Sequence, residues 1–418
     1  MNTEGCLGAV LHRAVTNPVD VALRFHHLGV WEQTTWHQYA ESIDAAARGL
    51  GNLGVVPGSR VGLVAENSPS WLVAFFAVQR CGAVVVVLSP ESSGNTVWSV
   101  FASQSVVAVI VGDQEQFDKI EEARIVGKLP SVGHIVVIAT RGMRRLDVPS
   151  IDANPAVLSW SRMTASVPDA AGVSFPDVTD DSVAIGLVDE HGAIRERTHT
   201  ELRADAHNAV SSASTTSSDE CMALGSFANA TSLTDDVLAH AISGMTISMS
   251  PVPELLLREI PEVRPSLLAA PSSVLARIHA DAQRRASRTK GLKRIAYRAA
   301  LRRGAKLDPR PPTAISPLVI TTSVIVFLAF LLASLTDSER PLSRLGPSFL
   351  LLFGFGAVAV LGGFAARRAV RNQYGLGRVR SVVSYGEPLD PGVLQWFQSI
   401  GVHVHDRKSD VKSEGVGV

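Results

Sequence analysis

The densest group of side chains that could bind a partner is a cationic run between residues 284 and 310. The arginines and lysines in it that we expect at the membrane surface are Arg284, Arg285, Lys293, Arg294, Arg302 and Arg303. Each such cation near an anionic lipid leaflet contributes up to about 1 kcal/mol of attraction. Leucine, isoleucine and alanine between them add a modest apolar face. The run predicts contact with a bilayer surface, and a solvated helix face is the alternative.

The other groups that could do chemistry are isolated. His403 and His405 alternate along an expected strand beside Asp406, but a metal site needs a further ligand that the sequence does not supply. The stretch 211–218 is rich in serine and threonine and has no glycine to open its backbone to phosphate, so we interpret it as a polar loop. The cysteines are Cys6, Cys81 and Cys221. Their small number and wide spacing indicate reduced thiols and neither a disulfide framework nor a zinc site.

Two apolar segments follow the cationic run, at residues 315–335 and 347–366. Each holds about 20 residues without a charged side chain, which is the length that an α-helix needs to cross a bilayer. Buried core helices are the alternative, but helices of that length in globular proteins carry a polar stripe. Basic residues flank the pair on both outer sides, so the positive-inside rule places both termini in the cytoplasm. We predict a two-helix transmembrane hairpin.

Composition limits the remaining possibilities. With 418 residues, 46% of them hydrophobic and 19% charged, the chain has room for two or three ordinary folded domains. Its formal net charge is zero, and no nucleic-acid motif or set of base-stacking aromatics is present, so we expect no nucleic-acid partner. The N-terminus lacks the basic and apolar regions of a signal peptide. We therefore expect a two-pass protein of the cell membrane whose soluble part lies in the cytoplasm.

The first third of the chain alternates short apolar strands with helical patterns. Alternation on both sides of the turn at Leu28 and Gly29 predicts a β-hairpin over residues 22–36, and the spacing from Tyr39 to Leu53 predicts a helix. Further strands are expected at 60–65, 82–88, 106–111 and 134–139, with helices at 71–81 and 97–104. This order predicts an α/β fold with a mostly parallel sheet covered by helices on both faces.

These segments carry a resemblance to a known family. The turn at 57–61, the Glu-Asn-Ser-Pro-Ser-Trp stretch at 66–71 and the apolar stretch at 81–90 resemble the N-terminal portion of AMP-forming acyl-CoA synthetases of the long-chain fatty acid type, in the adenylate-forming superfamily. The resemblance resumes at 256–301 and at 377–389. It implies two doubly wound α/β subdomains with the membrane hairpin inserted in the second. The expected division is 1–180, first subdomain; 181–310, first part of the second; 311–371, hairpin insertion; and 372–418, last part of the second with a polar tail.

In this family a glycine-rich loop cradles the triphosphate of ATP through backbone N–H groups and a cation. The corresponding stretch is 186–199, and with the segment that resembles the adenine-facing part of the family it implies these cofactor-binding positions: Gly192, Arg195, Thr198, Gly386 and Pro388. Asp189 and Glu190 would place negative charge beside the phosphates, where like charges about 4 Å apart cost on the order of 1 to 4 kcal/mol. Considered alone, the stretch indicates two strands joined by a turn.

Three departures from the family pattern concern catalysis. The stretch 224–229 lacks the histidine that the family carries near its acyl site, and residues 401–410 lack the Gly-Tyr-Gly-x-Thr-Glu motif whose glutamate helps to hold magnesium. The sequence ends at Val418, before the family's ribose-binding aspartate and the small C-terminal domain with its adenylation lysine. Loss of one preorganised cation typically costs about 10²-fold in rate. We therefore assign no catalytic residue and no metal ligand.

Three hypotheses remain. The first is a catalytically degenerate, membrane-anchored homologue of long-chain fatty acyl-CoA synthetases, which binds a fatty acid, an acyl-CoA or a protein partner at the cytoplasmic membrane face. The second is an active ligase that uses ATP and Mg²⁺ to form acyl-AMP and then acyl-CoA. The third is a truncated, non-functional product.

Overall fold

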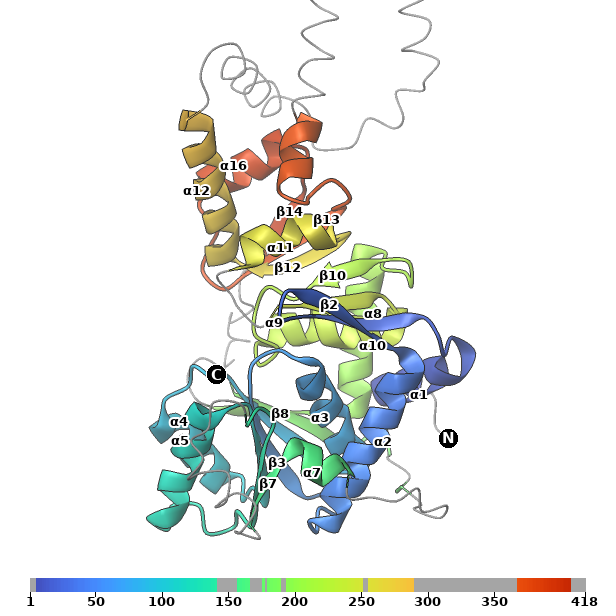
Figure 1. Cartoon of the computed structure of the whole chain (residues 1–418), viewed down its shortest axis with the longest axis vertical. Coiled ribbons are helices and arrows are strands. Elements are labelled where there is room, and N and C mark those ends of the chain that lie inside the picture. The colour runs from blue at the N-terminus through green and yellow to red at the C-terminus, as the bar shows by residue number, and fades with distance from the viewer. Residues whose placement is uncertain are drawn as a thin grey trace, which may run out of the picture. The chain divides into compact units, whose positions relative to one another are not determined.

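The computed structural model of the chain describes residues 5–140, 156–165, 175–176, 179–188, 193–250, 255–288 and 367–406 (Figure 1). The chain divides into two compact units. Unit 1 comprises residues 1–259 and 265–270, and unit 2 comprises 260–264 and 271–418. Both predicted membrane spans, 315–335 and 347–366, lie outside the described residues. Within the described ranges, no helix combines the length and the apolar composition that a membrane crossing requires.

The first sheet of unit 1 has seven strands in the order β7-β6-β5-β3-β4-β8-β9 (Figure 1). Their bounds are β3 Arg60–Val64, β4 Val84–Leu88, β5 Ala108–Val111, β6 His134–Val137, β7 Val157–Ser159, β8 Val183–Val188 and β9 Ile194–Thr198. All neighbours are parallel except β9, which is antiparallel to β8. The central strands β4 and β5 are buried along their whole length, which explains their continuous apolar sequence.

The helices of this sheet begin at side-chain caps. They are α3 Pro69–Arg80, α4 Gly94–Ser103, α5 Gln114–Ile125 and α7 Trp160–Ala165. Ser68 accepts a hydrogen bond from Trp71 N at 3.1 Å, and Pro69 occupies the first turn, where no backbone donor is needed. Asp113 caps α5 in the same way, through Gln116 N at 3.1 Å. The predicted strands and the helices at 71–81 and 97–104 are confirmed, whereas α5 was not predicted.

The second sheet of unit 1 runs in the order β12-β10-β11-β1-β2. The strands are β1 Val21–His27, β2 Val30–Thr35, β10 Glu220–Met222, β11 Thr246–Met249 and β12 Leu267–Pro271. β1 and β2 form the predicted antiparallel hairpin, and the other neighbours are parallel. β8 and β9 belong to the first sheet, whereas β1 and β2 belong to the second.

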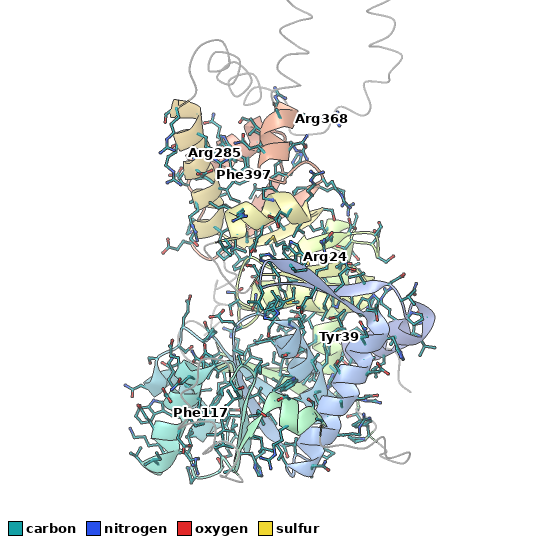
Figure 2. The ribbon with its side chains drawn as sticks, in the orientation of Figure 1. Arg24, Tyr39, Phe117, Arg285, Arg368 and Phe397 are labelled. Carbon is teal, nitrogen blue, oxygen red and sulfur yellow. The ribbon has the colours of Figure 1, made fainter. Side chains whose placement is uncertain are left out.

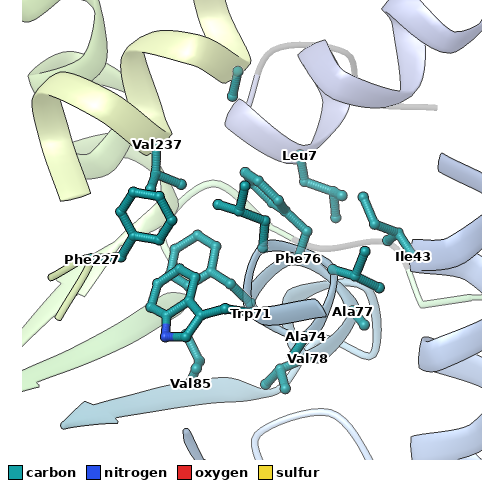
Figure 3. Packing of buried hydrophobic residues seen from close by; sticks show 14 of the residues in the cluster. Leu7, Ile43, Trp71, Ala74, Phe76, Ala77, Val78, Val85, Phe227 and Val237 are labelled. Carbon is teal, nitrogen blue, oxygen red and sulfur yellow. The ribbon is translucent and has the colours of Figure 1, made fainter. Parts of the chain in front are cut away.

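The remaining helical segments of the chain up to residue 263 are α1 Cys6–Thr16, α2 Trp36–Asn52, α8 His199–Ala213, α9 Ala230–Ser232, the π-helix η1 Leu233–Leu238, α10 Ala239–Ser243 and α11 Leu256–Val263. A capping box starts α2: Gln38 N donates to Thr35 Oγ1 at 3.3 Å, and Thr35 N donates to Gln38 Oε1 at 3.0 Å. α3 is buried around almost its whole circumference and is apolar on every side, as expected for a helix inside the unit. Figure 3 shows Trp71 of α3 against Phe227, with ring centroids 5.2 Å apart.

Unit 2 contains α12 Ser272–Arg288, a helical segment at 367–373, β13 Ser381–Tyr385, α16 Pro391–Ser399 and β14 Val404–Asp406. β13 and β14 are parallel, with Val382 opposite Val404. Asp390 caps α16 through Gly392 N at 2.7 Å, and Pro391 fills the first turn. Trp396 of α16 contacts His279 of α12 at a centroid distance of 5.5 Å, so the two helices pack together.

Candidate functional site

The predicted phosphate stretch folds as the β8–β9 hairpin. Leu187 lies opposite Arg195 in the antiparallel register, and β9 is the edge strand of the first sheet. Gly192, together with Asp189 and Glu190, lies outside the described residues. Arg195 is exposed on β9. The interpretation as two adjacent strands is therefore confirmed, and only Arg195 and Thr198 of the predicted phosphate positions can be placed.

Glu196 and Arg197 of β9 are both ion-paired. Glu196 Oε1 lies 2.6 Å from Nη1 of Arg60, and Arg197 contacts Asp205 at 2.7 Å and Glu201 at 3.3 Å. The guanidinium of Arg197 is thus neutralised by α8. A cation that is already paired with two carboxylates has little attraction left for a triphosphate, so Arg197 does not supply the charge that a phosphate loop needs.

Thr198 has a structural role. Its hydroxyl accepts a hydrogen bond from Glu201 N at 3.2 Å, and Glu201 Oε2 accepts one from Thr198 N at 2.9 Å, which forms the capping box of α8. Burial lowers the pKa of the adjacent His199, against a smaller opposite effect of Asp180. The described residues of this hairpin do not form a phosphate cradle. Among the residues that the structure describes, no group of histidine, cysteine or carboxylate side chains could hold a metal ion either.

The carboxyl edge of the first sheet is acidic. β3 and β5 are neighbours in the sheet, but the chain continues from β3 to β4 on one side and from β5 to β6 on the other. The strand order therefore reverses between β3 and β5, and their carboxyl ends lie at this edge. Four carboxylates follow the strands there: Glu66, Glu91, Asp113 and Glu115. Burial raises the pKa of Glu66, and the other three carboxylates raise it further. Lys119 is the neighbouring cation, and it donates to Pro90 O at 3.0 Å and contacts Glu115 at 2.9 Å.

Asn67 joins the carboxyl edges of the two sheets. It follows β3, and its Nδ2 donates to Gly225 O at 2.7 Å while its Oδ1 accepts from Phe227 N at 3.0 Å. The loop that it holds, residues 223–229, follows β10 and is the segment in which the family's histidine is missing. Asn229 ends this loop as the cap of α9, accepting from Thr231 N at 2.9 Å. The loop is therefore fixed at both ends.

Behind this loop lies a buried polar group that the sequence analysis missed. Asp236 of η1 is 1% exposed, and no described residue donates a hydrogen bond to either of its carboxylate oxygens. Burial raises the pKa of this carboxyl well above its usual range, and the nearby Asp235 raises it further, so its neutral form is favoured relative to an exposed aspartate. A π-turn and an unpaired carboxyl are both uncommon, and π-turns are frequent at functional sites. The signal in the sequence was an Asp-Asp pair inside an apolar helix.

The other predicted site residues lie in unit 2. Gly386 follows β13 with a φ of +88°, a backbone conformation that favours glycine, and Pro388 is exposed in the same turn. Arg284 and Arg285 lie near the end of α12. The remaining predicted membrane-surface residues, Lys293, Arg294, Arg302 and Arg303, lie outside the described residues. Arg195 and Thr198 thus share one strand, and Gly386 and Pro388 share one turn.

Comparison with known proteins identifies the family. Residues 10–179 match the AMP-binding enzyme family. This part of the chain belongs to that family. A long-chain-fatty-acid–CoA ligase of Drosophila melanogaster, heimdall, is 32% identical over 133 residues, which are 32% of this chain and 18% of the relative. The long-chain-fatty-acid–CoA ligase FadD15 of Mycobacterium tuberculosis is 33% identical over 120 residues, 28% of this chain and 20% of the relative. The aligned segments thus span less than a quarter of these curated relatives.

Solved structures agree on the fold. The N-terminal domain of FACL13 from Mycobacterium tuberculosis has a TM-score of 0.61 at 14% identity, over 97% of this chain and 76% of that one. The anthranilate CoA ligase AuaEII in complex with anthranoyl-AMP has a TM-score of 0.61 at 15% identity, over 97% of this chain and 58% of that one. The α/β architecture with two mixed sheets is therefore that of the N-terminal domain of adenylate-forming enzymes, and the predicted resemblance is confirmed.

Proposed function

We propose that this chain is a membrane-anchored relative of long-chain fatty acid–CoA ligases that binds a long-chain acyl ligand or a partner at the cytoplasmic membrane face without activating it with ATP. The relatives that match its AMP-binding segment are named as long-chain-fatty-acid–CoA ligases, which supports the acyl class of ligand. The two apolar runs at 315–335 and 347–366 support the anchor.

One observation carries the loss of ATP chemistry. On β9, the strand that leads away from the expected phosphate loop, Arg197 is paired with Glu201 and Asp205, and Thr198 caps α8. The loop itself contributes Asp189 and Glu190 in the sequence. A triphosphate carries several negative charges and needs uncommitted donors and cations. Arg197 and Thr198 already make ion pairs or cap a helix, and Asp189 and Glu190 would repel a triphosphate.

Calorimetry on the detergent-purified full chain tests the proposal. We expect no heat of binding with Mg-ATP at millimolar concentration, and saturable binding of a long-chain fatty acid. Arg195→Ala tests the altered loop, and Arg162→Ala, an exposed arginine of α7, is the matched control. Tight binding of Mg-ATP that Arg195→Ala abolishes and Arg162→Ala preserves would overturn the proposal in favour of an active ligase. Absence of fatty-acid binding would overturn the acyl part and leave a scaffolding role.

A further inference from the structure

The chain enters β13 through a tightly bonded turn. Arg371 donates from Nη2 to Val379 O at 2.8 Å and from Nε to Leu376 O at 3.0 Å, and its Nη1 reaches Gly401 O at 3.4 Å. Residues 376–379 precede β13 and Gly401 precedes β14, and these strands are parallel. Arg371 therefore marks the amino edge of this strand pair. Its pKa is lowered by burial, as expected for a guanidinium with a structural role.

The end of α12 lies at the same edge. Tyr374 follows the 367–373 segment, and its hydroxyl contacts Asp281 Oδ2 of α12 at 3.1 Å. The guanidinium of Arg285 lies 5.6 Å from the centroid of the Tyr374 ring. These contacts hold the last turns of α12 against the helical segment that leads to β13. Figure 2 labels Arg285 and Arg368 on these two neighbouring helices.

Exposed arginines gather here. We define the arginine face as Arg284, Arg285, Arg288, Arg368, Arg378 and Arg380, all of which are exposed. Asp281 is an acidic residue on this face, and it contacts Arg285 at 2.6 Å, Arg284 at 3.5 Å and the Tyr374 hydroxyl at 3.1 Å. In the described part of the chain, no carboxylate lies within ion-pair distance of Arg288 or Arg368. Asp281 pairs with Arg284 and Arg285, and Arg288 and Arg368 add two further cations, so this part of the face carries a surplus of positive charge.

We propose that the arginine face binds the phosphate groups of anionic phospholipids. A guanidinium group can donate two parallel hydrogen bonds to the oxygens of one phosphate. A cluster of arginines therefore suits a layer of phosphodiester headgroups. The chain leaves this face after Arg288 and returns to it at Arg367, and the residues between include both apolar runs. This proposal rests on the membrane location in the proposed function, but not on ligand binding or on the state of the ATP site.

The aromatic side chains near this face are buried, which argues against single-stranded nucleic acid as its ligand. Such partners bind by stacking their bases on exposed rings between the cations. Tyr374 and Trp396 are the aromatic residues near this face in the described part of unit 2 that contact α12, and they are 5% and 6% exposed. Both rings are committed to packing, since their centroids lie 6.1 Å apart edge to face. The face offers charge without stacking, which suits headgroups.

Binding of the arginine face to headgroups would give unit 2 a defined orientation relative to the bilayer. Gly386 and Pro388 follow the carboxyl end of β13, whereas the arginine face lies at its amino end. The five residues of β13 separate the two ends by about 16 Å at the usual rise of a strand. The turn that resembles the adenine-facing segment therefore points away from the headgroup layer, and a ligand at that turn would approach from the cytoplasm.

Residue-resolved arginine modification tests the face. The full chain is reconstituted into nanodiscs of phosphatidylcholine, with or without phosphatidylglycerol, and treated with phenylglyoxal before mass spectrometry. We expect Arg284, Arg288 and Arg368 to react about fivefold more slowly in the anionic discs, and high salt to remove this protection. Arg162 and Arg258, which are exposed in unit 1, are internal controls whose rates should not change.

Paired variants test the cause. The double variant Arg288→Gln, Arg368→Gln should lose the protection of Arg284, and the matched double variant Arg162→Gln, Arg258→Gln should keep it. Equal reaction rates in both kinds of disc would overturn the proposal, as would protection by added single-stranded RNA or inorganic phosphate that matches that of the anionic discs. If the chain does not enter discs, anionic vesicles added to the detergent-free protein test the same face. A failed anchor thus remains distinguishable from a failed arginine face.

Discussion

Asp236 and His240 are titratable groups whose pKa values are shifted by burial inside unit 1. His240 Nδ1 lies 2.6 Å from Met245 O, and its ring stacks on Trp36 at a centroid distance of 4.6 Å. Burial lowers the pKa of His240 to about 4, whereas it raises the pKa of Asp236 well above the usual range. Both shifts have the same cause, because a charged form is costly away from water. Their effects on stability have opposite signs with pH.

Asp236→Asn should change the pH dependence of stability. As pH rises from the ordinary carboxyl pKa, near 4, toward the raised pKa of Asp236, the unfolded wild type has lost the Asp236 proton while the folded state keeps it, so the free energy of unfolding falls by up to about 1.4 kcal/mol per pH unit. His240 contributes the opposite slope only between about pH 4 and 6.5. The variant should lose this decline in urea titrations. Parallel curves for both proteins would show that Asp236 is ionised in the folded state.

Asn67 is the residue that ties the loop at 223–229 to the first sheet. Asn67→Ala removes the partners of Gly225 O and Phe227 N and should lower the free energy of unfolding by about 1 to 3 kcal/mol. Asn67→Asp keeps the acceptor for Phe227 N but loses the donor to Gly225 O, so its loss should be smaller. Hydrogen exchange of the Phe227 amide, measured by mass spectrometry, should accelerate in Asn67→Ala and stay slow in Asn67→Asp. Unchanged exchange in both would mean that the bridge does not hold the loop.

At the scale of elements, helix starts depend on one or two side chains. Thr198→Ala removes the hydroxyl that accepts from Glu201 N and should cost about 1 kcal/mol of stability, whereas Thr198→Ser should be close to neutral. Thermal unfolding with both variants measures the difference. If Thr198 instead contacted a triphosphate, Thr198→Ala would weaken Mg-ATP binding without this loss of stability. The two variants therefore separate a cap from a phosphate ligand.

Elements with strong apolar periodicity could be predicted from the sequence. The strands near residues 60, 84 and 108 are continuous apolar runs, and burial on both faces explains them. Helix α5 was missed because its sequence is mainly polar and buries only Gln116, Ile120 and Ala123. The interpretation of 211–218 as a loop was partly wrong, since α8 continues to Ala213. Its buried side chains, such as Leu202 and Ala206, outweigh the low helix propensity of serine.

Contacts that hold the loop at 223–229 and the second sheet in place join residues far apart in the sequence. The hydrogen bond from Asn67 to Gly225 joins residues 158 positions apart, and the ion pair of Arg24 with Glu220 joins residues 196 positions apart. Local patterns report propensity and periodicity, so they cannot identify such partners. The predicted α/β class rested on local patterns and is confirmed, whereas the predicted hairpin insertion lies outside the described residues. The hydrogen bonds of Asn67 to the loop at 223–229 and the burial of Asp236 depend on how the strands are arranged in sheets, so local sequence patterns did not predict them.

The membrane hairpin remains a prediction, and the geometry of unit 2 makes it testable. The end of α12 and residue 374 lie in contact, since Asp281 Oδ2 is 3.1 Å from the Tyr374 hydroxyl. Deletion of 315–366 leaves residues 289–314 to bridge this short distance. Both units should therefore stay folded, and far-ultraviolet circular dichroism should show the helix content of the helices that remain. We expect the deleted chain to leave the membrane pellet at high salt, whereas the full chain should stay in it. Retention of the deleted chain in the high-salt pellet would place the anchor elsewhere in the sequence.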